Sequence, residues 1–211
     1  MISSVYVFGL VCLICVVCGY FIGSISTGMI IGRIKKVDLR QVGSGSTGTT
    51  NVLRTFGKIP ALITFVGDLA KVIIPIVLIR VFFGGEDYWY LLCLYYGLGA
   101  VIGHCYPFYM GFKGGKGIVV TAAIIISTSH PITIISGLIV FILLVLITRY
   151  VSVGSLFVVA LLLPLNTVLY HIHNKYFIHM LIVSLLVTAV DYYRHRANIV
   201  RLIHGEENKL F

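Results

Sequence analysis

Apolar residues are gathered along the chain into seven long runs, and short polar segments join each run to the next. A helix needs about 20 mainly apolar residues to cross the hydrocarbon core of a bilayer. The pattern therefore predicts an all-α integral membrane protein with about seven transmembrane helices, of which the fourth is the shortest. The predicted helices cover residues 5–31, 59–83, 88–110, 118–128, 132–147, 153–170 and 177–193.

The composition agrees with this pattern and leaves room for a single domain. Hydrophobic residues make up 59% of the 211 residues and charged residues only 11%, whereas a soluble domain carries about a quarter charged residues. No shift in composition marks a second domain, so residues 1–211 are predicted to form one membrane-embedded unit. The first run lacks the positive start of a signal peptide and is too long for one, so we interpret it as the first transmembrane helix.

Basic residues predict the orientation in the membrane, because Lys and Arg are concentrated in cytoplasmic loops. If the N-terminus lies outside, the outer segments hold only Arg80 and Lys175, and Lys71 lies within a span. This arrangement requires an odd number of spans and predicts a cytoplasmic C-terminus. The inner segments then hold Arg33, Lys35, Lys36, Arg40, Arg54, Lys58, Lys113, Lys116, Arg149, Arg194, Arg196, Arg201 and Lys209.

The net charge of +9 and the five cysteines do not require a specific partner. The basic residues lie in short loops between apolar runs, so membrane topology and a phosphate site account for them better than nucleic acid does. The cysteines lie inside the first and third runs and lack a second pair or histidines at zinc spacing. We therefore expect no nucleic-acid partner, no metal site and no disulfide framework.

Three polar segments rich in glycine and basic residues fall on the same predicted side of the membrane. They read GSGSTGTTNVLR (43–54), GFKGGKG (111–117) and RHRANIVRLIHGEENK (194–209). Glycine lets backbone N–H groups approach an anion closely, and Lys and Arg supply the opposing charge. The three segments together predict a site for phosphorylated substrates at the membrane boundary.

The first segment begins with glycines spaced as G-x-G-x-x-G, as in dinucleotide-binding loops. That fingerprint requires a preceding strand, whereas a membrane helix precedes this segment. We interpret it as a glycine- and hydroxyl-rich loop that runs into a helix start near residues 52–54, where free N–H groups favour an anion. A flexible interfacial linker is the alternative. The candidate contacts are Gly43, Ser44, Gly45, Ser46, Asn51 and Arg54.

The second segment carries Lys113 and Lys116 on either side of Gly114 and Gly115. It lacks Walker A spacing, since no Ser or Thr follows the last lysine. Two adjacent glycines let the backbone fold around an anion between two ammonium groups, although a basic inner loop is an equally good interpretation. His104, near the inner end of the preceding helix, is either a candidate acid or base or a structural residue.

The third segment carries His195, Asn198 and Arg201 at the helical spacing i, i+3 and i+6. This spacing predicts a short helix that adds all three side chains to the site. The alternative is a basic amphipathic tail lying on an anionic leaflet. A fourth inner loop adds the guanidinium of Arg149 and the hydroxyl of Ser152.

Taken together, the polar segments resemble the PlsY family of bacterial membrane acyl-phosphate:glycerol-3-phosphate acyltransferases. The resembling stretches are GSGSTGTTNVLRTFGK, GHCYPFYMGFKGGKG, RYVSVGS and HRANIVRLIHGEENK, which occur in the family's order with the predicted spans between them. Two positions depart from the family's first motif, where Ser46 replaces the usual asparagine and Thr49 the usual alanine. Ser46 keeps a hydroxyl donor but has a shorter reach.

The resemblance implies transfer of a fatty acyl group from acyl phosphate to the 1-hydroxyl of glycerol 3-phosphate, giving lysophosphatidic acid and inorganic phosphate. It implies a reaction without metal, cofactor or acyl-CoA. We expect a monomer in contact with membrane lipid in a bacterial plasma membrane, with the active site facing the cytoplasm.

The expected mechanism is direct attack by the acceptor hydroxyl, since no Ser-His-Asp arrangement or activated cysteine is evident. Positioning and charge neutralisation would then supply most of the rate. Phosphate is expected on Ser44, Arg54 and Lys113 or Lys116, and the acceptor is oriented by His195 and Asn198. The residues expected to act in catalysis are Ser44, Arg54, Lys116 and His195. The proton acceptor stays open between His195, His104 and a phosphate oxygen of the substrate.

Asp68 and Lys71 lie inside the second predicted helix, three positions apart on one face. Unpaired charges are costly in a membrane, so we interpret them as a structural ion pair, with support of the site from behind as the alternative. They also bear on the competing functional class, a small transporter or anion channel with a basic vestibule. A transporter predicts charged or broken segments near the midplane, and only these two charges are embedded.

Overall fold

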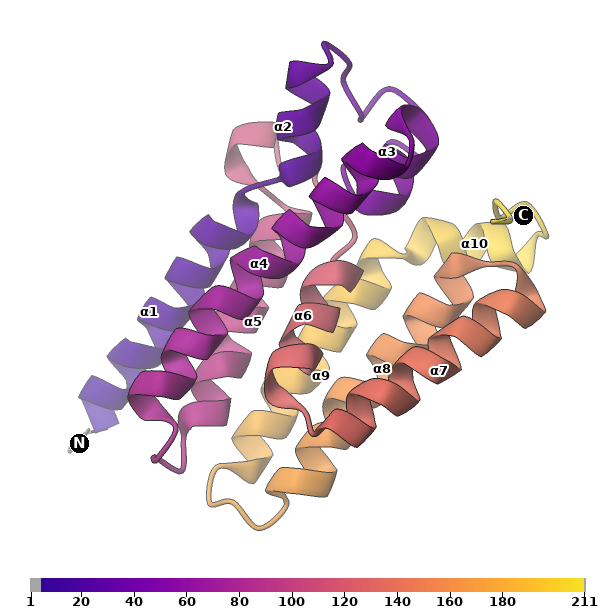
Figure 1. Ribbon diagram of the computed structural model, residues 1–211. Coiled ribbons are helices and arrows are strands. Elements are labelled where there is room, and N and C mark those ends of the chain that lie inside the picture. The colour runs from indigo at the N-terminus through magenta and orange to yellow at the C-terminus, as the bar shows by residue number, and fades with distance from the viewer. Residues whose placement is uncertain (1–4, 211) are drawn as a thin grey trace.

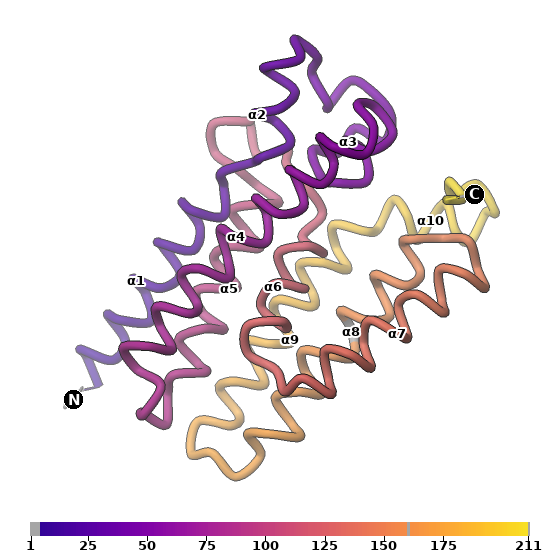
Figure 2. The backbone as a smooth tube through the Cα atoms, in the orientation of Figure 1, coloured from indigo at the N-terminus to yellow at the C-terminus, as the bar shows by residue number. Residues whose placement is uncertain are grey.

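The computed structural model describes residues 5–210, apart from the side chain of Ala160, and is built from helices (Figures 1 and 2). Six stretches of the described chain are long and apolar enough to cross a membrane, and a shorter apolar helix lies among them. The prediction of an all-α, multi-span membrane protein is therefore confirmed. In chain order the elements are α1 (Val5–Ser24), α2 (Thr27–Ile34), α3 (Thr49–Phe56), α4 (Lys58–Phe83), α5 (Trp89–Cys105), the 3-10 helix η1 (Phe108–Met110), α6 (Ile118–Thr128), α7 (Pro131–Thr148), α8 (Val151–His171), α9 (Phe177–Arg194) and α10 (Arg196–Ile203).

The first predicted helix, residues 5–31, is divided in the structure into α1 and α2. Ser26 caps α2, since its hydroxyl accepts a hydrogen bond from the Met29 N–H at 3.3 Å. The Tyr109 hydroxyl holds the break from the other side, donating to the Ser24 carbonyl at 2.6 Å and accepting from the Ser26 N–H at 3.3 Å. Serine competes with the helical backbone for hydrogen bonds, and the continuous apolar run concealed this break.

Helix α5 forms the centre of the bundle, and α1 packs closely along it. A Cβ atom on Gly19 or Gly23 of α1 would lie only 2.2 or 2.4 Å from backbone atoms of α5. One on Gly103 of α5 would lie 2.1 Å from a backbone carbonyl of α1. Small residues let membrane helices approach in this way. The tight packing fixes the end of α5, where His104 and Cys105 lead towards the second polar segment.

Helix α6 was predicted as the fourth span, and the structure gives it the predicted bounds. Its 11 residues make it about 16 Å long at about 1.5 Å per residue, which is too short to cross a core of about 30 Å alone. The connection through Ser129 and His130 leads directly into α7, whose first residue is Pro131. Figures 1 and 2 show that this turn stops short of the level reached by the α4–α5 and α8–α9 connections.

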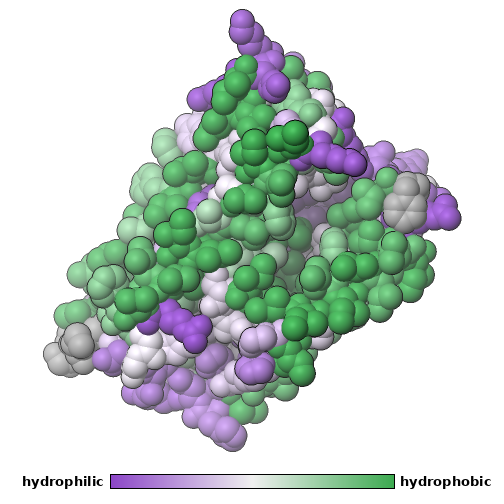
Figure 3. Space-filling model, viewed as in Figure 1, coloured by the Kyte–Doolittle hydropathy of each residue, from purple (hydrophilic) through white to green (hydrophobic). Residues whose placement is uncertain are grey.

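On the face seen in Figure 3 the side of the bundle is mostly apolar, and its two ends are polar. Large hydrophobic side chains on α1, α4 and α7 are exposed there, as expected for helices that face lipid. The end that carries α2, α3 and α10 also carries all three polar segments. We call it the site end.

Candidate active site

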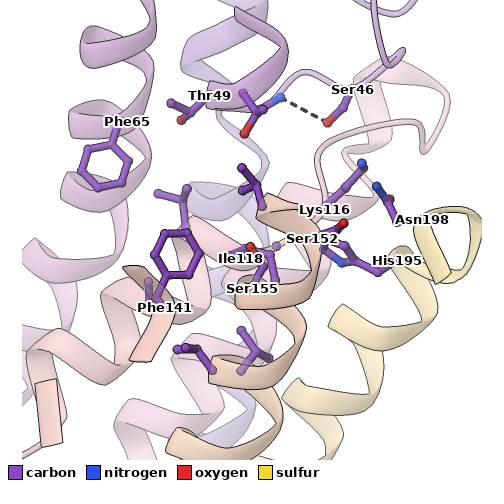
Figure 4. A pocket seen from close by; sticks show the side chains of 18 of the residues that line it. Ser46, Thr49, Phe65, Lys116, Ile118, Phe141, Ser152, Ser155, His195 and Asn198 are labelled. Carbon is purple, nitrogen blue, oxygen red and sulfur yellow. Dashed lines mark hydrogen bonds between the residues drawn. The ribbon is translucent and has the colours of Figure 1, made fainter. Parts of the chain in front are cut away.

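A cavity of about 440 Å³ opens at the site end and continues between the helices. The structure brings the three polar segments together around it, joined by α6, α7 and α8 (Figure 4). Polar side chains surround its upper part, and apolar side chains form the rest. Its polar lining includes Ser44, Ser46, Thr49, Asn51, Arg54, Asp68, His104, Lys116, Ser152, Ser155, His195, Asn198, Arg201 and Glu207.

Asn51 organises the first segment from within. Its side-chain amide donates to the carbonyls of Leu39, Val42 and Ser46 at 3.1, 3.0 and 2.8 Å. Its oxygen accepts from the Ser44 N–H at 2.9 Å. Asn51 was expected to bind substrate; it does line the cavity, but its hydrogen-bonding capacity is used to shape the loop. The helix that follows begins at Thr49, three residues before the predicted start.

Two glycines of the first segment that were expected to contact substrate, Gly43 and Gly45, lie outside the cavity lining. Gly43 and Gly45 have φ angles of +59° and +67°, which favour glycine, and neither lines the cavity. A Cβ on Gly43 would lie 2.1 Å from the side-chain oxygen of Asn51. These glycines therefore shape a turn that presents Ser44, Ser46 and, from α3, Arg54 to the cavity.

The second segment is held from behind. The N–H groups of Gly114 and Gly115 donate to the carbonyls of Cys105 and His104 at 3.1 and 3.0 Å. Their own carbonyls accept hydrogen bonds of 2.9 to 3.1 Å from the guanidinium of Arg194. Both glycines are buried away from the cavity lining. The N–H groups of both glycines therefore already have protein partners, so the backbone fold around an anion that was expected here stays a prediction.

Of the two lysines in this segment, only Lys116 lines the cavity, whereas Lys113 is exposed to the outside. Burial lowers the pKa of Lys116 to about 8. Glu207 opposes this shift, and the positive charges of Arg201 and Arg54 add to it. The cavity therefore gathers basic groups whose mutual repulsion an anionic ligand would relieve.

His104 is fixed by the ion pair predicted inside the second membrane helix. The Lys71 ammonium lies 2.9 Å from Asp68 Oδ1 and 3.0 Å from His104 Nδ1, and it also donates to the Ile25 carbonyl at 2.8 Å. The predicted ion pair is confirmed, and it does support a cavity residue from behind. Because an ammonium only donates, His104 Nδ1 accepts and its proton lies on Nε2. His104 has no free lone pair with which to take a proton from a substrate.

In His195 the two ring nitrogens have the opposite roles to those in His104. His195 lies at the junction of α9 and α10, and its Nδ1 is 2.9 Å from the Asp191 carbonyl. A carbonyl only accepts, so Nδ1 donates and Nε2 keeps its lone pair. Burial lowers the pKa of His195 to about 4, so the imidazole is neutral at pH 7.

The predicted short helix in the third segment is α10, and Glu207 ties it to the tail that follows. The Asn198 amide donates to Glu207 Oε1 at 2.6 Å, and Arg201 Nε donates to Oε2 at 2.7 Å. Burial favours the neutral carboxyl, but these hydrogen bonds outweigh it and hold the pKa of Glu207 below its usual range. The side-chain oxygen of Asn198 is buried and has no hydrogen-bond partner among the described residues. It is therefore available to a ligand.

Sequence analysis missed Glu207, although the residue lies within the third segment. Its role depends on the tail folding back onto α10, which no local pattern indicates. Of the fourth inner loop, Ser152 lines the cavity, whereas Arg149 does not. Arg149 lies at the turn before α8 with a φ angle of +64°, and its carbonyl accepts from the Leu210 N–H at 2.8 Å.

Apolar side chains from α6, α7 and α8 line the remainder of the cavity. This lining was not predicted, because these helices are apolar on every side and their sequences do not distinguish a cavity face from a lipid face. Among the described residues, no group of three or more His, Cys, Asp or Glu is placed to hold a metal ion. The apolar lining includes Ile118, Ala122, Ile125, Ile126, Ile134, Leu138, Phe141, Val151, Val158, Val159 and Leu162.

Comparison with known proteins gives one consistent family. The sequence model of the family described as "Glycerol-3-phosphate acyltransferase" matches residues 13–205. The glycerol-3-phosphate acyltransferase of Prochlorococcus marinus (strain MIT 9215) is 38% identical over 195 residues, which are 90% of this chain and 93% of that relative. That of Halalkalibacterium halodurans is 39% identical over 196 residues, which are 92% and 93% of the two chains.

Two solved structures share the fold. The crystal structure of PlsY (YgiH), an integral membrane glycerol 3-phosphate acyltransferase, in its glycerol 3-phosphate form matches with a TM-score of 0.80 and 34% identity, covering 95% of this chain and 96% of that chain. Its lysophosphatidic acid form matches with a TM-score of 0.79 and 32% identity, covering 95% of each chain.

These relatives are enzymes, so the comparisons favour an acyltransferase over a transporter or channel. The motifs that suggested the PlsY family surround one cavity in the structure. The chain belongs to the glycerol-3-phosphate acyltransferase family and is an integral membrane acyltransferase.

Proposed function

We propose that the protein transfers a fatty acyl group from acyl phosphate to the 1-hydroxyl of glycerol 3-phosphate, releasing lysophosphatidic acid and inorganic phosphate. One observation carries the proposal: a single cavity joins a basic, hydroxyl-lined end to a long apolar groove. The two substrates together need this combination, because each bears a phosphate and one bears a fatty chain. The glycerol 3-phosphate and lysophosphatidic acid forms of the structural relative support the acceptor and the product.

Phosphate binding is assigned to the basic groups around the cavity. Arg54 and Lys116 supply two positive charges from different segments, and Ser44 adds a hydroxyl from the turn. Arg201 lines the same cavity, but its Nε is already bound to Glu207. In a partly buried site these charges are screened less than in water, so they stabilise both the bound substrates and the phosphate that leaves.

The acceptor hydroxyl is assigned to His195 and Asn198. The Nε2 lone pair of His195 takes the proton of the 1-hydroxyl as its oxygen bonds to the carbonyl carbon of the donor. The bond between that carbon and the phosphate oxygen then breaks, and the leaving phosphate receives the proton. The unpartnered oxygen of Asn198 accepts a hydrogen bond from the glycerol moiety. No acyl-enzyme is needed, because the donor is already activated.

The remaining features of the proposal concern the membrane and the assembly. The excess of Lys and Arg in the segments at the site end supports a cavity that faces the cytoplasm. We also propose that the protein acts as a monomer, since one chain supplies both the basic groups and the apolar groove that the reaction needs. Introducing one cysteine at Lys113 and, separately, one at Lys175 tests the orientation. A membrane-impermeant thiol reagent is expected to label only the second variant in intact cells, and labelling of the first would reverse the orientation.

The donor is tested with the purified full chain in detergent or lipid mesophase. Palmitoyl phosphate and glycerol 3-phosphate are supplied together, and phosphate release is followed. Release that needs both substrates is the expected result. Turnover with palmitoyl-CoA but not with palmitoyl phosphate would overturn the donor assignment.

The residue roles are tested with two substitutions and one matched control. Arg54→Ala is expected to lower kcat/KM about 10²- to 10³-fold, as loss of a positioned charge does, and full activity at low glycerol 3-phosphate would remove Arg54 from the site. Lys58→Ala removes an exposed basic group four residues along the chain, at the start of α4, and is expected to have no effect. His195→Gln is expected to cost about 10²- to 10⁴-fold. If the rate and the pH–rate profile were both unchanged, the proton acceptor would be a phosphate oxygen of the substrate and not His195.

A further inference from the structure

The apolar groove of the cavity has a definite length and an end. On α8 the cavity lining runs from Val151, at the site end, to Leu162. At about 1.5 Å of rise per residue these two positions are separated by about 16 Å along the helix. The opposite wall is formed by α6 and α7, with Ile118 and Phe141 near the polar end (Figure 4). The groove therefore continues directly from the proposed phosphate site, and it is the space for the acyl chain if the proposed function holds.

Near the far end of the groove, α7 and α8 come into direct contact. Gly137 of α7 and Leu162 of α8 both line the cavity, and a Cβ on Gly137 would lie 2.2 Å from Leu162 Cδ1. The absence of a side chain at position 137 thus lets the Leu162 side chain rest directly on the backbone of α7. Leu162 is only 9% exposed, whereas its neighbour Leu161 is 48% exposed on the outer side of the helix.

The short helix α6 limits the groove at the same level. Ile126 is its last residue in the lining, and the helix ends two residues later. The chain then turns through Ser129 and His130 into α7, where Ile134 adds another apolar side chain. The turn stops short of the far end of the bundle (Figure 1), and no described residue of the α4–α5 or α8–α9 connections lines the cavity, so the groove ends within the bundle.

We propose that Leu162, seated on Gly137, forms the floor of the acyl groove and sets the length of acyl chain that the enzyme prefers. The methyl end of the chain contacts this side chain when the carbonyl carbon lies beside His195. A shorter chain leaves the floor unfilled and loses contacts, and a longer one must bend or displace Leu162. The competing arrangement is a chain that leaves sideways into lipid through the hollow visible in Figure 3, in which case the floor has no influence.

The test is a chain-length profile measured with lauroyl, myristoyl, palmitoyl and stearoyl phosphate. Leu162→Ala deepens the groove and is expected to raise kcat/KM for the longer donors relative to the shorter ones about tenfold, since single methylenes in a fitted apolar pocket change selectivity by about that factor or more. Gly137→Ala adds a carbon at the floor and is expected to shift the profile in the opposite direction. Leu161→Ala is the matched control, with the same truncation one residue away on the lipid side, and should leave the profile unchanged.

The readout is a ratio between donors within one sample, so a smaller folded fraction cancels. If Leu162→Ala does not fold, Leu162→Val removes one carbon from the same floor and predicts a smaller shift in the same direction. Unchanged profiles in both the position 162 and the position 137 variants would overturn the proposal in favour of lateral exit. Absence of phosphate release with every acyl phosphate would instead overturn the proposed donor, so the two failures are distinguishable.

Discussion

The two glycine-rich segments at the cavity look alike in sequence but are held in place in different ways. Residues 43–54 are organised by their own Asn51, whose side chain bonds to four backbone groups within or just before the segment. Residues 111–117 are organised from outside, by the end of α5 and by Arg194 at the end of α9. The first segment presents several side chains to the cavity, and the second presents mainly Lys116.

The difference shows that glycine content alone does not indicate a backbone anion site. In the first segment the left-handed φ angles of Gly43 and Gly45 shape a turn that displays hydroxyl groups. In the second segment, positions 114 and 115 have no room for a side chain, because His104 and the carbonyls of α5 lie against them. A Cβ on Gly115 would be 2.0 Å from His104 Nε2. Contacts within the segment therefore shape the first loop, and packing against other helices shapes the second.

Within this comparison, the largest expected effect separates the two lysines of the second segment. Lys116→Ala removes a cavity-lining charge, and we expect kcat/KM to fall about 10²- to 10³-fold. Lys113→Ala removes the same group from an exposed position three residues earlier and should leave kcat/KM unchanged. Both are measured by phosphate release at low glycerol 3-phosphate. Equal losses in the two variants would mean that the whole segment, and not one side chain, faces the substrate.

The same contrast explains how much of the fold was predictable. The predicted helices at 59–83 and 177–193 differ from α4 and α9 by one residue, because an apolar run bounded by polar residues has few ways to lie in a membrane. The break between α1 and α2 was not visible, since it depends on a hydroxyl of Tyr109 that arrives from another part of the chain. Helices defined by their own sequence were predictable, and features made by distant contacts were not.

In the candidate site, too, features set by local sequence were predictable and features set by distant contacts were not. His195, Asn198 and Arg201 were placed together by helical spacing, and all three line the cavity. The role of Glu207 requires the tail to fold back onto α10, and the tautomer of His104 requires Lys71 on another helix. Neither is encoded in local spacing. The apolar floor of the groove was hidden for a further reason, since large apolar residues occur on all sides of α7 and α8.

The next effect tests the external support of the second segment. Arg194 bonds to the carbonyls of Gly114 and Gly115 through two nitrogens, which a lysine ammonium does not reproduce. Arg194→Lys keeps the charge but is expected to lower kcat/KM about 10- to 100-fold by displacing Lys116, since a shift of about 1 Å has effects of this size. Arg196→Lys is the control, because Arg196 is an exposed residue bonded to a carbonyl of its own turn. An equal loss in both would assign the effect to surface charge.

A fall in activity at alkaline pH is expected from the second segment. The pKa of Lys116 is lowered to about 8, mainly by burial, so its positive form is present below that pH and is lost above it. If Lys116 binds phosphate, kcat/KM of the free enzyme is level between about pH 5 and pH 8 and falls about tenfold per pH unit above pH 8. A guanidinium group stays charged throughout this pH range. Lys116→Arg should therefore remove the fall, and a fall that persists in this variant would have another source.

The smallest expected effect concerns the glycines of the first segment. Gly48 caps α3 in an extended conformation with φ −83°, and a Cβ there would meet its nearest atom, Ser46 Oγ, at an ordinary 3.6 Å. Gly48→Ala should therefore change the free energy of unfolding by no more than about 0.5 kcal/mol, because restricting the unfolded chain and weakening the helix cap act in opposite directions. Gly43→Ala is the contrasting variant, with φ +59° and a Cβ 2.1 Å from the Asn51 side chain, and should disrupt the turn and the activity.

Gly48 also lines the cavity, so the same variant shows how the first segment holds its ligand. If side chains such as those of Ser44 and Arg54 hold phosphate, an added methyl group at position 48 leaves the KM for glycerol 3-phosphate unchanged. A raised KM with unchanged thermal stability would mean that phosphate lies directly against the backbone at the start of α3. In that case the first segment would bind anions through its N–H groups after all, and its difference from the second segment would lie in which backbone groups are left free.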